Sequence, residues 1–209
     1  MNTVWMAGLI GISLGISASL KPWRQLQQAG LWTPLLAALV LLPWLWALPR
    51  LHEMPLQLQL SGATLVLLCL GWPLAVWVLA IVSVLADLLA PVSTDQWLRE
   101  LFYLGWLPAT LALGLGAAMR RWLPMHPFVY ILGRGFLGTA LCVFAASLLA
   151  TWLEEPLPRV ETGLSLIAQW LMAWGDAFLT GLMTAILVAF RPQWLATWSD
   201  PLYLRPPSE

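Results

Sequence analysis

Three charged side chains stand inside long apolar runs of this sequence, and they are the first candidates for chemistry. They are Asp87, Arg134 and Asp176. A charged group in such surroundings is costly unless it faces a partner, a bundle interior or water, and it often serves in binding or ion coupling. Asp176 is the deepest of the three and has Gly175 and Ala177 beside it, small residues that permit close helix approach. We predict that Asp176 faces the interior of a helix bundle.

Two interpretations of Asp176 remain open. In the first, its carboxylate binds a substrate or couples transport to an ion. In the second, it pairs with Arg134 on the preceding apolar run, which would offset the cost of burial without any transport. Asp87 lies near the end of its run, where a solvated helix-end carboxylate is the simpler interpretation. Together the three residues are the candidate substrate or coupling residues.

Other residue types with chemical potential are sparse. His52 and Glu53 are weak candidates for an external metal site, because transition metals bind imidazole and carboxylate groups, but a loop histidine is more often simply polar. Cys69 and Cys142 lie in apolar runs without CxxC spacing and are interpreted as buried thiols. No zinc-protease, serine-hydrolase or P-loop motif occurs in the sequence. We therefore predict that the chain is not an enzyme and holds no cofactor.

The composition indicates that these residues lie in a lipid bilayer. Of 209 residues, 60% are hydrophobic and 10% are charged, whereas soluble proteins carry about 25% charged residues. Ten basic and ten acidic residues balance. No basic stripe marks a nucleic-acid surface, so we exclude nucleic acid as a partner. The prediction is a single all-α integral membrane domain over residues 1–209.

The apolar runs divide this domain into helices. A helix needs about 20 apolar residues to cross a hydrocarbon layer of about 30 Å. The run from 60 to 90 is too long for one upright helix and contains Pro73, which removes a backbone donor and favours a break. We predict about seven transmembrane helices over 3–20, 31–49, 60–71, 73–90, 100–119, 128–152 and 163–190, followed by a tail over 191–209.

The positive charges predict the orientation of these helices, because cytoplasmic loops collect lysine and arginine. With seven spans, one side carries Lys21, Arg24, Arg120, Arg121, Arg191 and Arg205. The other side carries only Arg50, Arg99 and Arg159. The first side is therefore predicted to be cytoplasmic, with the N-terminus outside and the C-terminus inside.

Several segments between about Leu35 and Leu204 form a recognisable set: Ser61-Gly62, Leu70-Gly71-Trp72-Pro73-Leu74, Leu123-Pro124, His126-Pro127-Phe128-Val129-Tyr130, Gly175-Asp176-Ala177-Phe178-Leu179-Thr180-Gly181, Arg191-Pro192-Gln193-Trp194 and Asp200-Pro201-Leu202-Tyr203-Leu204. In these segments the sequence resembles the CbiM-like family, the permease or substrate-capture subunits of cobalt and nickel energy-coupling-factor (ECF) transporters, in its divergent proteobacterial branch.

The resemblance implies a location, a function and partners. It implies a seven-helix protein of the bacterial inner membrane with its N-terminus outside, which takes part in transition-metal uptake linked to cobalamin biosynthesis. The implied partners are a transmembrane coupling subunit and a pair of cytoplasmic ATPases. An ABC-type permease of this kind needs no nucleotide motif of its own.

The sequence departs from the family where metal is bound. Metal-binding members use a histidine after the first methionine, the terminal amine and a histidine after a Ser-Gly pair. Asn2 and Ala63 stand at these positions here, so we predict that nickel or cobalt is not held in the N-terminal manner of the family. The acidic residue of the last helix is usually Glu in the family and is Asp176 here. The alternative to a transport subunit is an accessory or assembly membrane protein on the same bundle.

Overall fold

The computed structural model describes residues 3–27, 29–51, 60–153 and 162–203, and these residues form helices without any strand. The α-helices are α1 (Thr3–Ser19), α2 (Trp32–Leu51), α3 (Ala63–Leu70), α4 (Trp72–Leu89), α5 (Thr94–Glu100), α6 (Leu107–Trp122), α7 (Gly138–Leu153), α8 (Thr162–Phe190) and α9 (Asp200–Tyr203). Between them lie η1 (Pro22–Gln27), η2 (Ala29–Leu31), η3 (Leu101–Trp106), η4 (Val129–Leu137) and η5 (Pro192–Trp194).

Five of these helical stretches are long and apolar enough to cross a membrane: Trp32–Leu51, Trp72–Leu89, Thr94–Trp122, Val129–Leu153 and Leu166–Phe190. A shorter apolar helix, Thr3–Ser19, precedes them. Large apolar side chains such as Trp5, Trp44 and Trp152 are exposed on the outside of the bundle, as lipid-facing surfaces require. The prediction of an all-helical membrane protein with several spans is confirmed at this level.

The predicted break before Pro73 is present, but the helix in front of it is shorter than the predicted span 60–71. α3 has eight residues, which at 1.5 Å per residue gives about 12 Å, less than half of the hydrocarbon layer. Gly62 precedes it with φ 63° and Gly71 follows it with φ 73°. These positive φ angles, of which only that of Gly62 belongs to a left-handed helical conformation, favour glycine and end the helix on both sides. α3 is therefore a half-length helix between two glycine turns.

Two other stretches contain wider helical turns. η3 and η4 are π-helical, and the Leu107 and Gly138 amides donate five residues back to the carbonyls of Phe102 and Gly133. Such turns occur inside longer helices and are frequent at functional sites. Here η3 joins α5 to α6 in one continuous stretch, and η4 opens the stretch that continues as α7.

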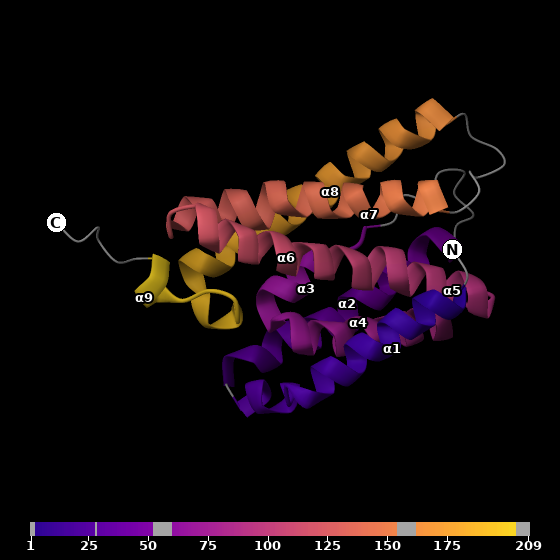
Figure 1. Cartoon of the computed structure of the whole chain (residues 1–209). Coiled ribbons are helices and arrows are strands. Elements are labelled where there is room, and N and C mark those ends of the chain that lie inside the picture. Colours follow the sequence, from indigo (N-terminus) through magenta and orange to yellow (C-terminus); the bar gives the residue numbers. More distant parts are fainter. Residues whose placement is uncertain (1–2, 28, 52–59, 154–161, 204–209) are drawn as a thin grey trace.

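The ends of the helices gather at two opposite ends of the bundle (Figure 1). At one end, Arg50 of α2 donates to the Ala90 carbonyl at 2.8 Å and forms an ion pair with Glu100; we call this the Arg50 end. At the other end, Ser17 donates to the Pro73 carbonyl and Arg120 to the Thr197 carbonyl. We call this second end the basic end, because the helix ends and connections there hold Lys21, Arg24, Arg120, Arg121 and Arg191.

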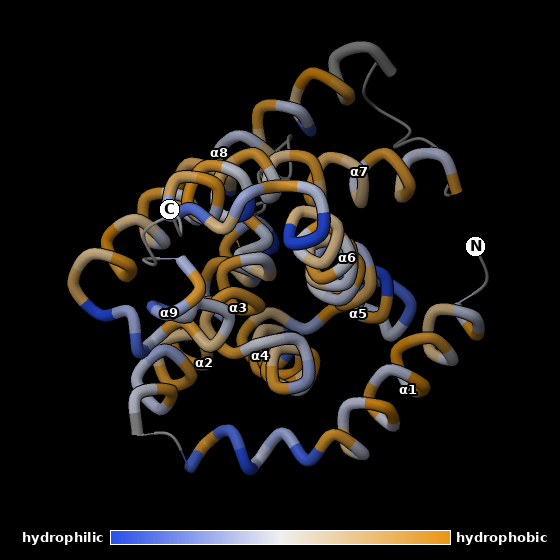
Figure 2. Tube along the Cα trace, turned by 60° about the vertical axis from the view of Figure 1, so that its left-hand side comes forward, coloured by the Kyte–Doolittle hydropathy of each residue, from blue (hydrophilic) through white to orange (hydrophobic). Residues whose placement is uncertain are grey.

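The short helix α3 occupies the centre of the bundle. It contacts α2, α4, α6 and α8, and every residue of α3 except Leu65 is buried. Figure 2 shows α3 enclosed by its neighbours, with hydrophilic residues concentrated in connecting segments such as the one between α1 and α2. A helix with apolar residues all round is expected in such a buried position.

Candidate functional site

The most distinctive polar site lies where α3 begins and α8 passes it. Asp176, in the middle of α8, is 1% exposed. Its Oδ2 accepts from the Ser61 backbone amide at 2.7 Å, and its Oδ1 accepts from the Gly62 amide at 3.0 Å. The carboxylate thus satisfies amides that the start of a helix leaves without partners, at the end where the helix dipole favours negative charge. The predicted interior position of Asp176 is confirmed.

Ser61 connects this site to two further helices. Its hydroxyl donates to the Leu104 carbonyl of η3 at 2.6 Å and accepts from the Ala63 amide at 3.2 Å. Its own carbonyl accepts from the indole Nε1 of Trp46, on α2, at 3.0 Å. Most of these groups are buried away from water, so the hydrogen bonds satisfy polar atoms that would otherwise have no partner. Ser61 therefore joins α2, α3, η3 and α8 in one network.

Gly62 is required at this site for two reasons. Its φ of 63° is a conformation that L side chains rarely adopt. A Cβ on Gly62 would also lie 2.9 Å from Leu42 Cδ2, well inside normal carbon contact. The absence of a side chain lets the backbone of residues 61 and 62 reach the Asp176 carboxylate beside α2.

The opposite end of α3 is held by the segment that follows α8. The Ala196 amide donates to the Cys69 carbonyl at 2.9 Å, and the Thr197 amide and hydroxyl donate to the Leu68 carbonyl at 3.3 and 2.8 Å. Since the Thr197 hydroxyl gives its proton to Leu68, the Tyr130 hydroxyl donates to Thr197 Oγ1 at 2.7 Å. Both ends of α3 are thus fixed by residues of the C-terminal third of the chain.

The ion pair between Asp176 and Arg134 that the sequence suggested is not formed, and that interpretation is wrong. Neither Asp176 nor Arg134 forms an ion pair with another of the described residues, whereas Arg50 pairs with Glu100. Asp176 instead uses both oxygens for backbone amides. Arg134 lies on η4 with its guanidinium carbon 5.4 Å from the centre of the Tyr130 ring. The backbone amides at the start of α3 satisfy the Asp176 carboxylate, and Arg134 contacts the Tyr130 ring instead.

Asp87 lies neither at the start of α3 with Asp176 nor on η4 with Arg134. Its Oδ1 accepts from the Val92 amide at 3.0 Å, just after the end of α4. This bond closes the turn at the Arg50 end and agrees with the interpretation of Asp87 as a helix-end carboxylate. The structure therefore places the three predicted residues at three separate sites: Asp87 at the Arg50 end, Asp176 beside α3, and Arg134 on η4.

The residues considered for metal binding are only partly described. His52, Glu53, Met54 and Asn2 lie outside the described residues. Ala63 is fully buried as the first residue of α3. Within the described ranges, no three His, Cys, Asp or Glu residues gather as a metal site would need, and Cys69 and Cys142 are buried free thiols.

Three residues of the site, Ser61, Trp46 and Thr197, are not predicted from the sequence. A Ser-Gly pair in front of an apolar run is a usual start signal for a helix, and it could have marked Ser61. Nothing local connects Trp46 or Thr197 to α3, because their partners are remote in the sequence.

Fold and site together define a polytopic helical membrane protein with an interrupted, internally capped helix at its centre. Comparison with protein-family models, curated proteins and solved structures finds no match for this chain.

Proposed function

We propose that this chain is the membrane-embedded substrate-capture or permease subunit of an ECF-type importer in the bacterial inner membrane. The observation that carries the proposal is the interrupted helix, α3 and α4, whose first half begins against the interior carboxylate of Asp176. Transporters commonly build substrate and ion sites from interrupted helices whose ends meet polar groups near the middle of the membrane. Such breaks are tolerated there only where the protein itself satisfies the freed backbone groups.

The proposed topology has seven crossings with the N-terminus outside. Leu51 lies at the Arg50 end and Leu70 at the basic end, which supports a third crossing between these two residues. Among the described residues, and apart from Arg134 within η4, the basic end holds five basic residues, Lys21, Arg24, Arg120, Arg121 and Arg191, against Arg50 and Arg99 at the other. This asymmetry supports a cytoplasmic basic end.

Reporter fusions test this topology. A reporter after Arg99 is expected to show the periplasmic side, and reporters after Arg121 and Arg191 the cytoplasmic side, because positive loops are retained inside. Each position is fused once to an enzyme that is active only outside the membrane and once to a fluorescent protein that is active only inside. The ratio of the two signals corrects for differences in expression. Equal signals after Arg99 and Arg121 would contradict the proposed number of crossings.

The proposed partners are a transmembrane coupling subunit and two cytoplasmic ATPases. They supply the energy, since no P-loop motif occurs in this chain. Affinity purification of the tagged, full-length chain from native membranes in mild detergent is expected to recover both kinds of partner. An untagged strain and a tagged, unrelated multi-pass protein are the controls.

A second function, that of an accessory or assembly protein, is favoured by one observation. Both oxygens of Asp176 are occupied by backbone amides, so the carboxylate already has a structural role. Recovery of the chain without any ATPase, together with unchanged cobalt and nickel uptake when the chain is deleted, would contradict the transport proposal and favour the accessory role. For a transport subunit, deletion is expected to lower uptake, and restoring the chain is expected to restore it.

A further inference from the structure

The stretch that runs from α5 through η3 into α6 contains a carbonyl without its usual helical donor. In a regular α-helix the Leu104 carbonyl accepts from the amide four residues later. That residue is Pro108, which has no N–H. The stretch is also π-helical here, since the Leu107 amide reaches back to the Phe102 carbonyl. Proline and π-helical turns are both common places for a helix to bend, so η3 is a hinge within this stretch.

A donor for this carbonyl comes from the residues in front of α3. The Ser61 hydroxyl donates to the Leu104 carbonyl at 2.6 Å, across 43 residues of sequence. Ser61 is buried, and a carbonyl left without a donor inside a membrane protein is costly. The Ser61 hydroxyl therefore takes the place of the amide that Pro108 lacks.

Trp46 of α2 joins the same two places a second time. Its indole Nε1 donates to the Ser61 carbonyl at 3.0 Å. Its ring lies against η3, where a Cβ on Gly105 would come within 3.0 Å of Trp46 Cη2. Trp46 is fully buried, so it fills the space between Ser61 and η3. A shift of Ser61 would disturb both the hydroxyl contact and the tryptophan contact with η3.

The backbone of Ser61 is bound to α8 at the same time. Its amide donates to Asp176 Oδ2 at 2.7 Å, while its side chain binds Leu104. One residue thus contacts the Asp176 carboxylate with its backbone and the hinge at η3 with its hydroxyl. Any change that draws Asp176 away from the Ser61 amide also acts on the position of that hydroxyl.

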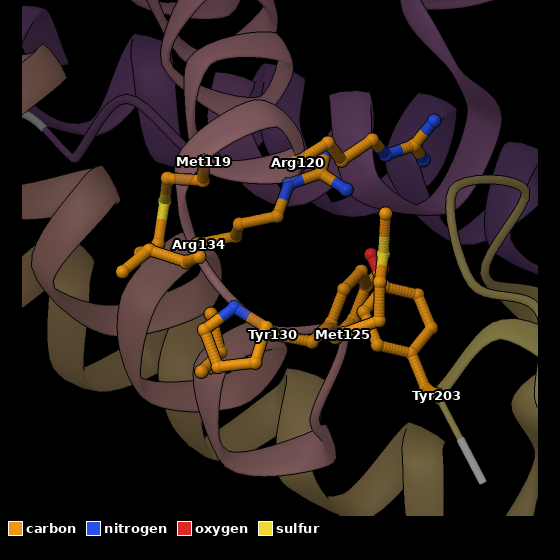
Figure 3. Close-up of a pocket in the computed structure, with 9 residues that line it drawn as sticks. Met119, Arg120, Met125, Tyr130, Arg134 and Tyr203 are labelled. Carbon is orange, nitrogen blue, oxygen red and sulfur yellow. The ribbon is translucent and has the colours of Figure 1, made fainter. Parts of the chain in front are cut away.

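The other π-helical stretch, η4, obtains a comparable donor locally. The Thr139 hydroxyl, four residues further along the same stretch, donates to the Gly135 carbonyl at 2.8 Å. η4 packs against α6 through Arg134, whose side chain extends toward the helix that carries Met119 and Arg120 (Figure 3). The hydroxyl donor of η4 therefore belongs to its own stretch, whereas that of η3 belongs to the segment that binds Asp176.

We propose that the Ser61 hydroxyl is a latch that holds the hinge at η3 and couples it to the Asp176 carboxylate. While Asp176 binds the Ser61 amide, the hydroxyl holds the Leu104 carbonyl and η3 stays closed. When Asp176 releases the amide, Ser61 shifts, the Leu104 carbonyl loses this donor and the α5–α6 stretch bends more freely. The latch concerns the fold itself and applies equally to a transport subunit and to an accessory protein.

Hydrogen–deuterium exchange of the full-length protein in detergent, followed by mass spectrometry of peptides that cover residues 101–112, tests the latch. Ser61→Ala is expected to speed amide exchange in this segment about tenfold, the effect of leaving one buried carbonyl without a donor. Thr139→Val is the matched control, because it removes the corresponding hydroxyl from η4. It is expected to speed exchange in η4 and to leave residues 101–112 unchanged.

Pro108→Ala separates the latch from a general loss of packing, because it restores an N–H that can donate to the Leu104 carbonyl. In this background Ser61→Ala is expected to lose most of its effect on residues 101–112. The Ser61 hydroxyl also accepts from the Ala63 amide at 3.2 Å. If it acted only there, Ser61→Ala would have the same effect with and without Pro108, and this result would overturn the proposal.

Asp176→Asn tests the coupling, since the asparagine turns an N–H toward one of the two backbone amides. It is expected to speed exchange of residues 101–112 in the natural sequence and to add nothing once Ser61→Ala has opened the latch. Should Ser61→Ala fail to fold, the comparison uses Pro108→Ala, in which Asp176→Asn is expected to leave residues 101–112 unchanged. An effect of Asp176→Asn that is confined to residues 60–66, or one that adds fully to that of Ser61→Ala, would show that no coupling exists.

Discussion

Replacing Asp176 with alanine is expected to lower the free energy of unfolding by about 4 kcal/mol, since it leaves two buried backbone amides without acceptors. The amides are those of Ser61 and Gly62, which donate to the Asp176 carboxylate at 2.7 and 3.0 Å. The variant also removes the negative charge at the start of α3. Unfolding of the purified protein by SDS, followed by tryptophan fluorescence, measures this loss.

Two aspartate variants control for this effect. Asp176→Asn keeps one carbonyl oxygen as an acceptor but turns an N–H toward the second amide, so about half of the loss is expected. Asp87→Asn keeps the single acceptor used by Val92, and its effect is expected to be small. If Asp176→Ala and Asp87→Asn unfold alike, the carboxylate does not stabilise the start of α3.

The same variants separate the two roles considered for Asp176. A purely structural carboxylate predicts that any remaining transport falls in step with the amount of folded protein. A coupling carboxylate predicts that Asp176→Asn, where it folds, loses uptake beyond the loss of folded protein. Uptake normalised to folded protein in the membrane therefore decides between these roles.

Gly62→Ala is expected to destabilise the protein by about 2–3 kcal/mol, because a left-handed conformation costs about 1–2 kcal/mol for an L residue and the new methyl group adds an overlap. The structure gives Gly62 a φ of 63° and places the added Cβ 2.9 Å from Leu42 Cδ2. The change is also expected to push the amides of residues 61 and 62 away from Asp176. The SDS titration used for Asp176 measures the loss.

Gly114→Ala is the matched control. Gly114 lies in α6 with nothing within 4 Å of an added Cβ, and alanine favours a helix over glycine by about 0.8–1.0 kcal/mol. This variant is therefore expected to be neutral or slightly stabilising. In a Leu42→Ala background, which removes the overlap but not the backbone cost, adding Gly62→Ala is expected to cost less than it does in the natural sequence. Equal stability of Gly62→Ala and Gly114→Ala would show that the turn at residue 62 tolerates a side chain.

The resemblance to the CbiM-like family stays a prediction, but the residues that carry it acquire physical roles. Ser61 and Gly62 form the turn that meets Asp176, and Gly71 forms the turn before α4. Tyr130 and Tyr203 pack with their ring centres 5.1 Å apart at the basic end. These segments are therefore the places where the helices of this bundle are joined.

Local properties of the sequence were enough to predict several features. Runs of about 20 apolar residues identify membrane helices because the bilayer demands that length. Pro73 marks the break after α3 because proline removes a backbone donor. The sequence predicts that Asp176 faces the interior of the bundle, because a carboxylate that faces lipid is too costly. Each of these arguments uses only a residue and its neighbours along the chain.

Only the tertiary structure determines which groups bind the buried polar side chains. Asp176 meets Ser61 across 115 residues of sequence, and Thr197 meets Leu68 across 129, distances over which no local pattern carries information. From the sequence, Arg134 is the expected partner of Asp176, because both lie in apolar runs and their charges are opposite. The backbone amides of Ser61 and Gly62, left without helical partners before α3, compete with Arg134 for the same carboxylate and lie beside it. Which of the two acceptable partners a buried charge meets depends on where the helices pack, and helix packing is a property of the whole bundle.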